Sequence, residues 1–401
     1  MSARWQTSTL GEILEKTATV NPLQSPDTEF DYIDVSSVSN ETFRIGETQR
    51  LKGKDAPSRA RRLVRKKDVL LATIRPTLQR IAIVPDEFDG QVCSTGYFVL
   101  RPKSGIDYRF VFYYLFDATF MDQMEALQKG ASYPAVTDAE VRGQPFAFPP
   151  LAEQHRIVGI LDEAFDGIAT AKANAEKNLQ NARALFESHL QAVFTQRRDG
   201  WLVVALEKVT SIVNGFAFSS SDFSPSNTVN CIKITNVGVG EFVEDTDSFL
   251  PTGFNSTYAD VAVRAGDIVL ALTRTIIADG LKVATVPKAF DGALLNQRVA
   301  AIRSKPECLH LPFLFAFLGT NLVSDYVRLH VNTLMQPNLS IKDLRSMPIP
   351  LPPIHDQVRI TADLLRLQAE TQRLESLYQQ KLTALDALKK SLLHQAFSGA
   401  L

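Results

Sequence analysis

The sequence contains one segment twice. "FAFPPLAEQHRIVGIL" covers residues 146–161 and "IPLPPIHDQVRITADL" covers residues 349–364, and a long stretch of helical character follows each copy. The offset between matched positions grows only from 196 residues at the tryptophans, 5 and 201, to 203 residues at the Pro-Pro pairs. Other matches occur in the same order: "VRKKDVLLATIR" (64–75) with "VRAGDIVLALTR" (263–274), and "FDGQVCSTGYFVLRPK" (from Phe88) with "FDGALLNQRVAAIRSK" (from Phe290). The chain is therefore predicted to be a duplication of one structural unit.

Each half begins with a globular domain, residues 1–151 and 200–354. Both domains are rich in β-branched and aromatic residues, interrupted by Gly, Pro, Asn and Asp, which is typical of short strands and turns. The aromatic segments 109–127 and 311–329 look like matching helices whose rings form the core. "QPFAFPP" and "MPIPLPP" are each predicted to be a final strand, which the prolines confine to a sheet edge. The other expected strands are "DVLLATI", "RIAIVP" and "GYFVLRP" in the first domain and "DIVLAL", "LKVATVP" and "RVAAIR" in the second.

A long helix follows each domain, in segments 152–199 and 355–401. Residues 152–197 contain no proline, and residues 355–397 contain neither proline nor glycine. Helices of this length span about 65 Å at about 1.5 Å per residue, so one small domain cannot cover their apolar stripes. Each helix is expected to cover the other, with small alanines against large leucines, as an antiparallel two-stranded coiled coil. The predicted stripes are Ile157, Leu161, Ala164, Ile168, Ala175, Leu179, Ala182 and Phe186 in the first helix, and Leu374, Leu377, Leu385, Leu388 and Leu392 in the second.

Composition excludes several classes of protein. The longest apolar runs are far shorter than the roughly 20 residues of a membrane span, and the first residues lack a signal-peptide core, so a cytoplasmic protein without membrane contact is expected. Three widely spaced cysteines (93, 231 and 308) argue against a disulfide framework or a zinc site. The formal net charge is −1, yet residues 51–80 hold ten Lys or Arg against two Asp. This run is either a solvated face or a phosphate-binding surface.

No catalytic constellation is recognisable in the sequence. The phosphate-binding pattern GxxxxGK[ST], the dinucleotide pattern GxGxxG, the zinc motif HExxH and the nucleophile motif GxSxG are all missing. His155 and His355 lie in the repeated segment but at positions that do not correspond, so neither is expected to be a ligand or a catalytic base. The chain is predicted to bind rather than to catalyse.

These residues resemble the specificity (S) subunit of type I restriction-modification enzymes, over essentially the whole chain. The resemblance rests on two domains each closed by a "PxPPLxEQxRI"-like segment, on "NGFAFSSSDF" (214–223) and "QPNLS" (336–340), and on "LLHQAFSGAL" at the end of the chain. The second repeated segment departs from the pattern with "PIHDQVRI", and the first domain has "ASYPAVT" where the second has "QPNLS". The implied fold class is α+β: two duplicated α/β target-recognition domains joined by two long helices forming an antiparallel coiled coil.

The resemblance also implies a function and partners. The chain would carry no active site and no cofactor, while S-adenosylmethionine, ATP and Mg would be held by partner subunits. It would bind double-stranded DNA, two DNA-methyltransferase (modification) subunits, and restriction/translocase subunits, in a system of phage defence. Each domain would read one half of a split DNA site, and the paired helices would set the unspecified gap.

Two sets of site residues are predicted. Base readout is expected from the loops that flank the matched strands, because the strand interiors face the core. In such loops Arg would match guanine, and Asn or Gln would match adenine. The exposed polar residues that recur at the helix starts are expected either to dock the methyltransferase or only to cap the helices. The predicted DNA-binding residues are Arg75, Thr77, Gln79, Arg80, Ser94, Thr95, Lys129, Ser132, Tyr133, Arg274, Thr275, Lys282, Asn296, Gln297, Arg298, Gln336 and Asn338. The predicted docking residues are Glu153, Gln154, Arg156, Asp356, Gln357 and Arg359.

Two other functions remain open from the residues alone. The first is a structural or adaptor protein in which the coiled coil is the interface and the domains bind proteins. The second is an enzyme of unrecognised chemistry. Salt-dependent DNA binding separates the first from a specificity subunit, and co-purification with a methyltransferase separates both. If the helices act as a ruler, inserting about one helical turn near Ala175 lengthens the gap and leaves the bases unchanged.

Overall fold

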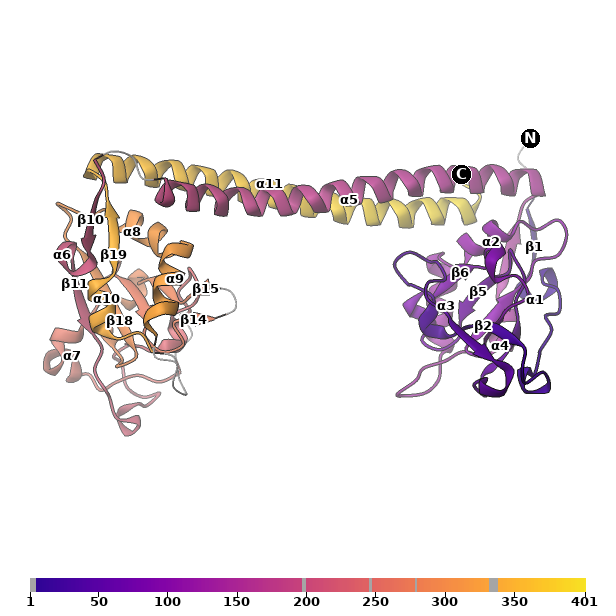
Figure 1. Cartoon of the computed structure of the whole chain (residues 1–401), viewed down its shortest axis with the longest axis horizontal. Coiled ribbons are helices and arrows are strands. Elements are labelled where there is room, and N and C mark those ends of the chain that lie inside the picture. Colours follow the sequence, from indigo (N-terminus) through magenta and orange to yellow (C-terminus); the bar gives the residue numbers. More distant parts are fainter. Residues whose placement is uncertain (1–4, 197–199, 245–246, 278–279, 332–337) are drawn as a thin grey trace. The chain divides into compact units, whose positions relative to one another are not determined.

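The computed structural model describes residues 5–196, 200–244, 247–277, 280–331 and 338–401. The chain divides into two compact units (Figure 1). Unit 1 comprises Met1–Lys177 and Tyr378–Leu401, and unit 2 comprises Asn178–Leu377. Each unit therefore contains one globular domain and a part of both long helices. Among the described residues, no helix combines the length and the apolar character that a membrane span requires.

The two long helices are α5 (Leu151–Thr195) and α11 (Ile354–Ser398), each of 45 residues, and they lie close to the predicted segments 152–197 and 355–397. In unit 1 the first part of α5 lies beside the last part of α11, where Lys172 Nζ is 2.7 Å from Asp386 Oδ1. In unit 2 the last part of α5 lies beside the first part of α11. The helices therefore run antiparallel, which confirms the predicted coiled-coil pairing.

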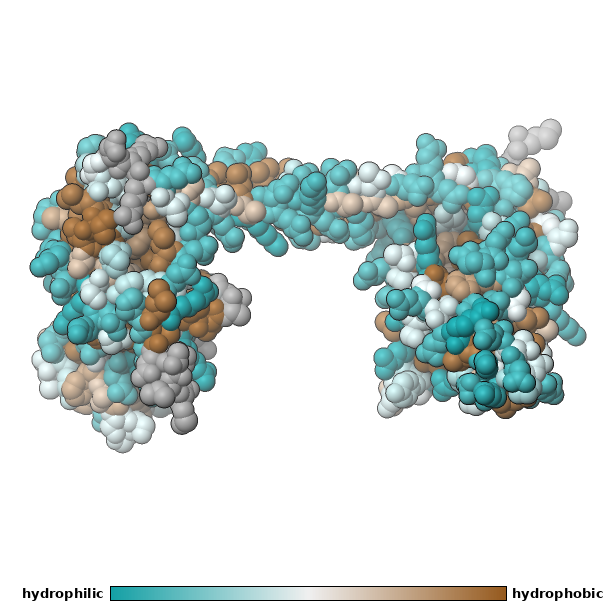
Figure 2. Space-filling view, viewed as in Figure 1, coloured by the Kyte–Doolittle hydropathy of each residue, from teal (hydrophilic) through white to brown (hydrophobic). Residues whose placement is uncertain are grey.

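The apolar stripe of α5 is buried or half-buried as predicted, but three of the five leucines predicted to form the stripe of α11 are exposed. Leu374, Leu377 and Leu388 are exposed, with exposed fractions of 36%, 55% and 47%. The covered positions of α11 recur every seven residues instead: Leu364 and Thr371 are buried, and Tyr378, Leu385 and Leu392 are half-buried. Packing against the partner helix covers these positions, although one of them is a threonine and another is a tyrosine. In Figure 2 the visible face of the paired helices is mostly hydrophilic.

Unit 1 contains a small sheet of strand order β1-β9, a four-stranded sheet of order β3-β2-β7-β4 and a three-stranded sheet of order β6-β5-β8. β5 is buried along its whole length, which explains its continuous run of apolar residues. β9 carries the prolines and pairs only with β1 among the described strands, as predicted for an edge. The strands are β1 (Gln6–Thr9), β2 (Glu29–Ile33), β3 (Gln49–Lys52), β4 (Ala60–Leu63), β5 (Val69–Ala72), β6 (Ile81–Ile83), β7 (Val92–Ser94), β8 (Tyr97–Leu100) and β9 (Pro145–Phe148).

Unit 2 repeats this arrangement. β10 pairs with β19 as β1 does with β9, and β16-β13-β18 has the order of β6-β5-β8, with β11 added beside β18. β12 pairs in parallel with β17 as β2 does with β7. The described strands are β10 (Leu202–Ala205), β11 (Thr210–Asn214), β12 (Cys231–Ile232), β13 (Ile268–Ala271), β14 (Ile276–Ile277), β15 (Gly280–Leu281), β16 (Val283–Thr285), β17 (Leu294–Leu295), β18 (Val299–Ser304) and β19 (Pro348–Leu351).

The shorter helices also correspond between the units. Each aromatic segment predicted as one helix is two helices. In unit 1 Asp117 caps the second helix by accepting a hydrogen bond from Thr119 N. Phe110 of the first helix packs with Ile157 of α5 and Leu393 of α11 in the core of unit 1. The short helices of unit 1 are α1 (Leu10–Ile13), α2 (Tyr108–Tyr114), α3 (Ala118–Leu127) and α4 (Asp138–Arg142). Those of unit 2 are α6 (Leu206–Val209), α7 (Phe254–Thr257), α8 (Leu311–Leu318), α9 (Asn321–His330) and α10 (Ile341–Ser346).

Candidate functional site

The repeated segment forms a buried joint between the domain and its helix. Gln154 of unit 1, in the first turn of α5, is completely buried. Its Oε1 accepts a hydrogen bond from Asp107 N at 2.8 Å, just before α2. Its Nε2 donates to Gly105 O at 3.1 Å and to Pro149 O at 2.9 Å. One amide side chain thus links the start of α5, the start of α2 and the end of β9.

Unit 2 contains the same joint, built on Gln357. This side chain is also completely buried. Its Oε1 accepts from His310 N at 2.8 Å, and its Nε2 donates to Cys308 O at 3.0 Å and Pro352 O at 2.8 Å. The prediction that Gln154 and Gln357 are exposed docking residues is therefore wrong, because both satisfy buried backbone groups.

The other predicted docking residues lie at the surface of the joints. Arg156 donates two hydrogen bonds to Glu153, at 2.9 and 2.7 Å, and this pairing lowers the pKa of Glu153. The corresponding pair in unit 2 joins Arg359 and Asp356 at 2.6 Å. Each pair is preceded by an apolar residue, Leu151 or Ile354, whose exposed fraction is 38% in both units. The two units therefore present the same surface group at the helix start.

The central strands β5 and β13 begin at matching buried ion pairs. Arg101 Nε and Nη2 donate to Asp68 at 2.8 and 2.6 Å in unit 1. Arg303 makes the same two contacts with Asp267, at 3.0 and 2.6 Å, in unit 2. Because the carboxylates also accept backbone hydrogen bonds from Arg65 N and Arg264 N, the start of each strand is held in place.

A left-handed arginine follows each of these strands. Arg75 and Arg274 both have φ of 49°, a region that L-residues other than Gly, Asn and Asp rarely occupy. Both side chains are exposed. Strained backbone of this kind persists where the surrounding structure imposes it, and it gathers at functional sites.

In unit 1 the turn after β7 and a distant loop hold Arg75. Thr73 N donates to Gly96 O at 2.8 Å, and Arg75 N donates to Pro134 O at 2.7 Å. The Arg75 guanidinium donates to Ser132 O at 3.0 Å and lies over the Tyr133 ring, 5.5 Å from its centroid. The structure thus brings together five predicted residues: Arg75, Thr95, Ser132, Tyr133 and, beside the same depression of about 250 Å³, Arg80.

In unit 2 the backbone contacts of Leu272, two residues before Arg274, match those of Thr73, whose O also accepts from Val136 N at 2.9 Å in unit 1. Leu272 N donates to Arg298 O at 2.9 Å, and Leu339 N donates to Leu272 O at 2.8 Å. The structure therefore brings together Arg274, Arg298 and Asn338, all of which are exposed. Gln336, the other residue predicted in this loop, lies outside the described residues.

Two predicted reading residues are buried and bonded within the protein. Ser94 accepts a hydrogen bond from Gly96 N, and Thr275 donates one to Leu272 O at 3.0 Å. Their prediction as DNA contacts is wrong, since both hydroxyl groups complete turns. Asn296 is half-buried, and its backbone carbonyl lies so close to Gly215 that a side chain there would collide with it.

Three predicted cations also have partners within their units. Arg80 donates to Val38 O at 2.6 Å, and Lys282, at the matching position, donates to Ile234 O at 2.8 Å. Burial, and secondly the charge of Arg274, lower the pKa of Lys282. Lys129 pairs with Glu140 at 2.9 Å, and the hydrogen bond from the Thr137 backbone, together with Lys129, lowers the pKa of Glu140 to about 2.

Thr77, Gln79 and Gln297 remain at or near the surface of the loops, as predicted. Two neighbours of these loops were not among the predicted site residues. Arg59 is exposed and its carbonyl accepts from Thr95 N, and the basic run 51–80 gave the signal that could have found it. Phe216, with an exposed fraction of 42%, forms a bridge with Asn296, and its position within "NGFAFSSSDF" gave the signal that could have found it.

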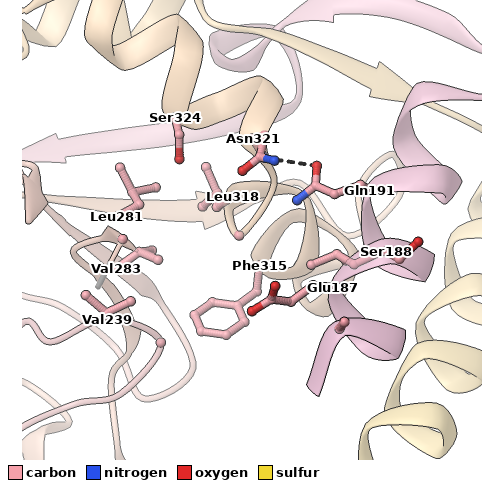
Figure 3. A pocket seen from close by; sticks show the side chains of 15 residues that line it. Glu187, Ser188, Gln191, Val239, Leu281, Val283, Phe315, Leu318, Asn321 and Ser324 are labelled. Atoms are coloured by element: carbon pink, nitrogen blue, oxygen red, sulfur yellow. Dashed lines mark hydrogen bonds between the residues drawn. The ribbon is translucent and has the colours of Figure 1, made fainter. Parts of the chain in front are cut away.

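Two cavities lie beside the long helices. In unit 2 a cavity of about 530 Å³ lies between α5, α8 and α9, where Asn321 N donates to Gln191 Oε1 at 3.0 Å (Figure 3). Its described lining contains a single carboxylate, Glu187. In unit 1 a cavity of about 790 Å³ is lined by residues of α3, α5 and α11 and by the loops that contain Phe43 and Gln79.

Two of the three cysteines, Cys93 and Cys231, are buried. Burial raises the pKa of the Cys93 and Cys231 thiols to about 12, so both stay protonated at neutral pH. No group of three or more His, Cys, Asp or Glu side chains in the described ranges is placed to hold a metal ion.

Comparison with known families accounts for the duplicated joint and the duplicated arginine. The sequence model of the type I restriction modification DNA specificity domain matches the chain twice, at residues 3–180 and 198–384. The chain belongs to this specificity family. The resemblance noted in the sequence, and the fold class that it implies, are thereby confirmed.

Relatives and solved structures of the specificity family agree with this. The specificity subunit of the type I restriction enzyme MjaVIII from Methanocaldococcus jannaschii is 31% identical over 58% of this chain and 57% of its own length. The EcoBI specificity subunit of Escherichia coli is 26% identical over 55% of this chain and 43% of its own length. The chain thus spans about half the length of these relatives.

The structural comparisons cover nearly the whole chain. The HsdS subunit from Thermoanaerobacter tengcongensis has 27% sequence identity and a TM-score of 0.73, over 99% of this chain and 97% of its own. A chain whose structure addresses complex assembly and conformational transition of the type I R-M system has 27% identity and a TM-score of 0.80, over 99% and 98% of the two chains.

Proposed function

We propose that this chain is the DNA sequence-specificity subunit of a type I restriction-modification complex, and that each unit reads one half of a bipartite DNA site. The observation that supports this most strongly is the duplicated left-handed arginine. Arg75 and Arg274 follow matching strands and have the same φ, and the residues two positions earlier, Thr73 and Leu272, make matching backbone hydrogen bonds with two other loops. Because these side chains are exposed, core packing does not explain why both units have an arginine with a strained backbone at this position, and we infer that it serves binding at the surface.

The chemistry of these loops suits base readout in the major groove. An arginine presents two parallel donors to O6 and N7 of guanine, a contact that contributes about 1–3 kcal/mol of discrimination. Ser132 and Tyr133 orient Arg75 in unit 1, while Asn338 of unit 2 offers the amide that matches adenine. Exposed cations of the run 51–80, such as Arg59, would contact phosphates and fix the register of the DNA.

The proposed partners are two methyltransferase subunits, one for each unit, together with restriction/translocase subunits. The support is the surface group that both units share: Leu151, Glu153 and Arg156 in unit 1, and Ile354, Asp356 and Arg359 in unit 2. An interface used twice on one chain suits two copies of the same partner. In this proposal the chain itself is not catalytic, and the partners hold S-adenosylmethionine, ATP and Mg.

Charge reversal tests the docking part of the proposal. The R156E/R359E variant is expected to stay folded, because both arginines are exposed, and to lose co-purification with the methyltransferase. K177E/R373E changes the same total charge at exposed positions away from the joints, and its assembly is expected to be unchanged. Equal assembly of the two variants would restrict Arg156 and Arg359 to capping the helices.

We also propose that α5 and α11 set the gap between the half-sites. Inserting one heptad near Ala175 and one near its neighbour on α11, Thr383, keeps the seven-residue stripe and adds about 10 Å of helix. The preferred gap should grow by about three base pairs, at about 3.4 Å per pair, while the bases at both ends stay the same. A change of bases with an unchanged gap would contradict the ruler.

A further inference from the structure

Two ion pairs join the long helices, and in both of them the same helix supplies the positive charge. Lys172 of α5 pairs with Asp386 of α11 at 2.7 Å in unit 1, and Arg183 of α5 pairs with Glu375 of α11 at 3.1 Å in unit 2. α5 supplies the cation and α11 the anion both times. The side chains are 32–60% exposed, so each pair is weak and sensitive to salt.

The duplication relates these two pairs to each other. Leu151 begins α5 and Ile354 begins α11, so each residue of α5 corresponds to the one 203 positions later. Lys172 therefore corresponds to Glu375, and Arg183 corresponds to Asp386. The two ion pairs are the same contact used twice, and the duplicated positions have opposite charges.

This relation determines what a helix would meet in a second copy of itself. Two α5 helices, antiparallel in the same register, would place Lys172 of each opposite Arg183 of the other. Two α11 helices would place Glu375 opposite Asp386 in the same way. Both homotypic pairings therefore contain two like-charge contacts, and only the pairing of α5 with α11 contains two attractive ones.

The sizes of the side chains along the covered stripe also favour pairing of α5 with α11 over pairing of either helix with its own copy. Ala175 and Ala182 are buried in α5, and the corresponding residues of α11 are Tyr378 and Leu385. Pairing α5 with itself would leave alanines facing each other and open space between the helices. Pairing α11 with itself would crowd tyrosine and leucine into space that is filled here by alanine and a large residue together.

We propose that these charges and sizes form a pairing code: the α5 surface accepts the α11 of a complementary half and rejects a second copy of α5. The code selects the partner by repulsion in the wrong pairings as well as by attraction in the right one. It thereby keeps two halves with different reading loops together and disfavours assemblies of two identical halves. This inference does not depend on the proposed DNA-reading function.

Two full-length variants with equal net charge separate this code from a general need for charges. K172E/R183E/E375K/D386K reverses both ion pairs, so that both α5–α11 contacts stay attractive and the contacts of each homotypic pairing stay repulsive. K172E/E375K makes both α5–α11 contacts repulsive and makes α5–α5 and α11–α11 contacts attractive. Two copies of each variant, with different affinity tags, are co-expressed at low salt, and co-purification of one tag through the other is measured.

K172E/E375K should co-purify with its own copy several-fold more than the wild type and the quadruple variant do, and 1 M NaCl should abolish the excess. If K172E/E375K does not fold, K172Q/E375Q replaces it in the test. This variant removes one charge from each ion pair, so its co-purification with its own copy should still exceed that of the wild type, by less than K172E/E375K would show. Equal co-purification of all folded variants would overturn the proposal. A lower melting temperature without any excess would also overturn it, since the charges would then stabilise the pair without choosing the partner.

Discussion

Replacing Gln154 by leucine is expected to loosen unit 1 more than any surface substitution on the same helix. Leucine has a similar size but cannot replace the three hydrogen bonds of this buried amide. Asp107 N and Pro149 O would lose their partner inside the protein, while Gly105 O lies nearer to solvent and is more easily rehydrated. The perturbation thus leaves two well-buried backbone groups unsatisfied.

The magnitude follows from those two groups. An orphaned buried donor or acceptor costs about 1–3 kcal/mol, so the free energy of unfolding of unit 1 should fall by about 2–6 kcal/mol. For a unit of this size, about 2–4 °C of melting temperature is lost per kcal/mol, which predicts a decrease of about 4 to 24 °C. Q357L should lower the stability of unit 2 by a similar amount, because Gln357 makes the same three contacts.

Urea and thermal unfolding, followed by circular dichroism, measure this effect. The matched control is Q180L, the same substitution at an exposed position of α5, which is expected to change stability by less than about 0.5 kcal/mol. If Q154L unfolded within about 0.5 kcal/mol of Q180L, the joint would not hold the helix to the domain and the reasoning would be refuted.

Two further predictions concern the reading loops. R274G and R274A should lose specific DNA binding equally, by about 5- to 150-fold, which corresponds to a lost contact of about 1–3 kcal/mol. R274G should nevertheless be more stable than R274A by about 1 kcal/mol, because glycine relieves the positive φ. Equal stability of the two variants in thermal unfolding would argue against backbone strain. The pKa of Glu140 is lowered from its ordinary value of 4.5 to about 2, so its contact with the Thr137 backbone stabilises the loop above pH 4.5 and is lost as the pH falls toward 2. Hydrogen exchange of Thr137 should show this loss in the wild type and not in E140Q, and an identical pH profile in both would contradict it.

Much of the architecture could be predicted because duplication leaves many independent matches in the sequence. Proline-free segments of matching length located α5 and α11, and the alternation of apolar residues located edge strands such as β9. The leucine stripe of α11 failed for a physical reason. Thr371 is buried because its hydroxyl donates to backbone carbonyls of its own helix, while Leu374 is exposed, so hydrophobicity alone does not reveal the phase of the interface.

The reading site could be predicted as a set of loops but not residue by residue. Gln154 looks like a solvated residue of a first helical turn, and its burial depends on contacts 47 residues away. Arg80 looks like a free cation, yet its partner Val38 lies 42 residues earlier in the chain. Such long-range hydrogen bonds leave no local signal. Arg274 is exposed, and its neighbours in the sequence do not reveal its left-handed backbone conformation.

Mapping of methylated bases in genomic DNA tests the central claim most directly. Cells carrying this chain with its methyltransferase should show one bipartite motif with a fixed gap, and cells in which residues 4–151 are exchanged for the first domain of another specificity subunit should show one half of the motif changed and the other half retained. R274G should alter or weaken methylation only at the half read by unit 2. A motif that is not split, or an exchange of residues 4–151 that leaves both halves unchanged, would contradict the account.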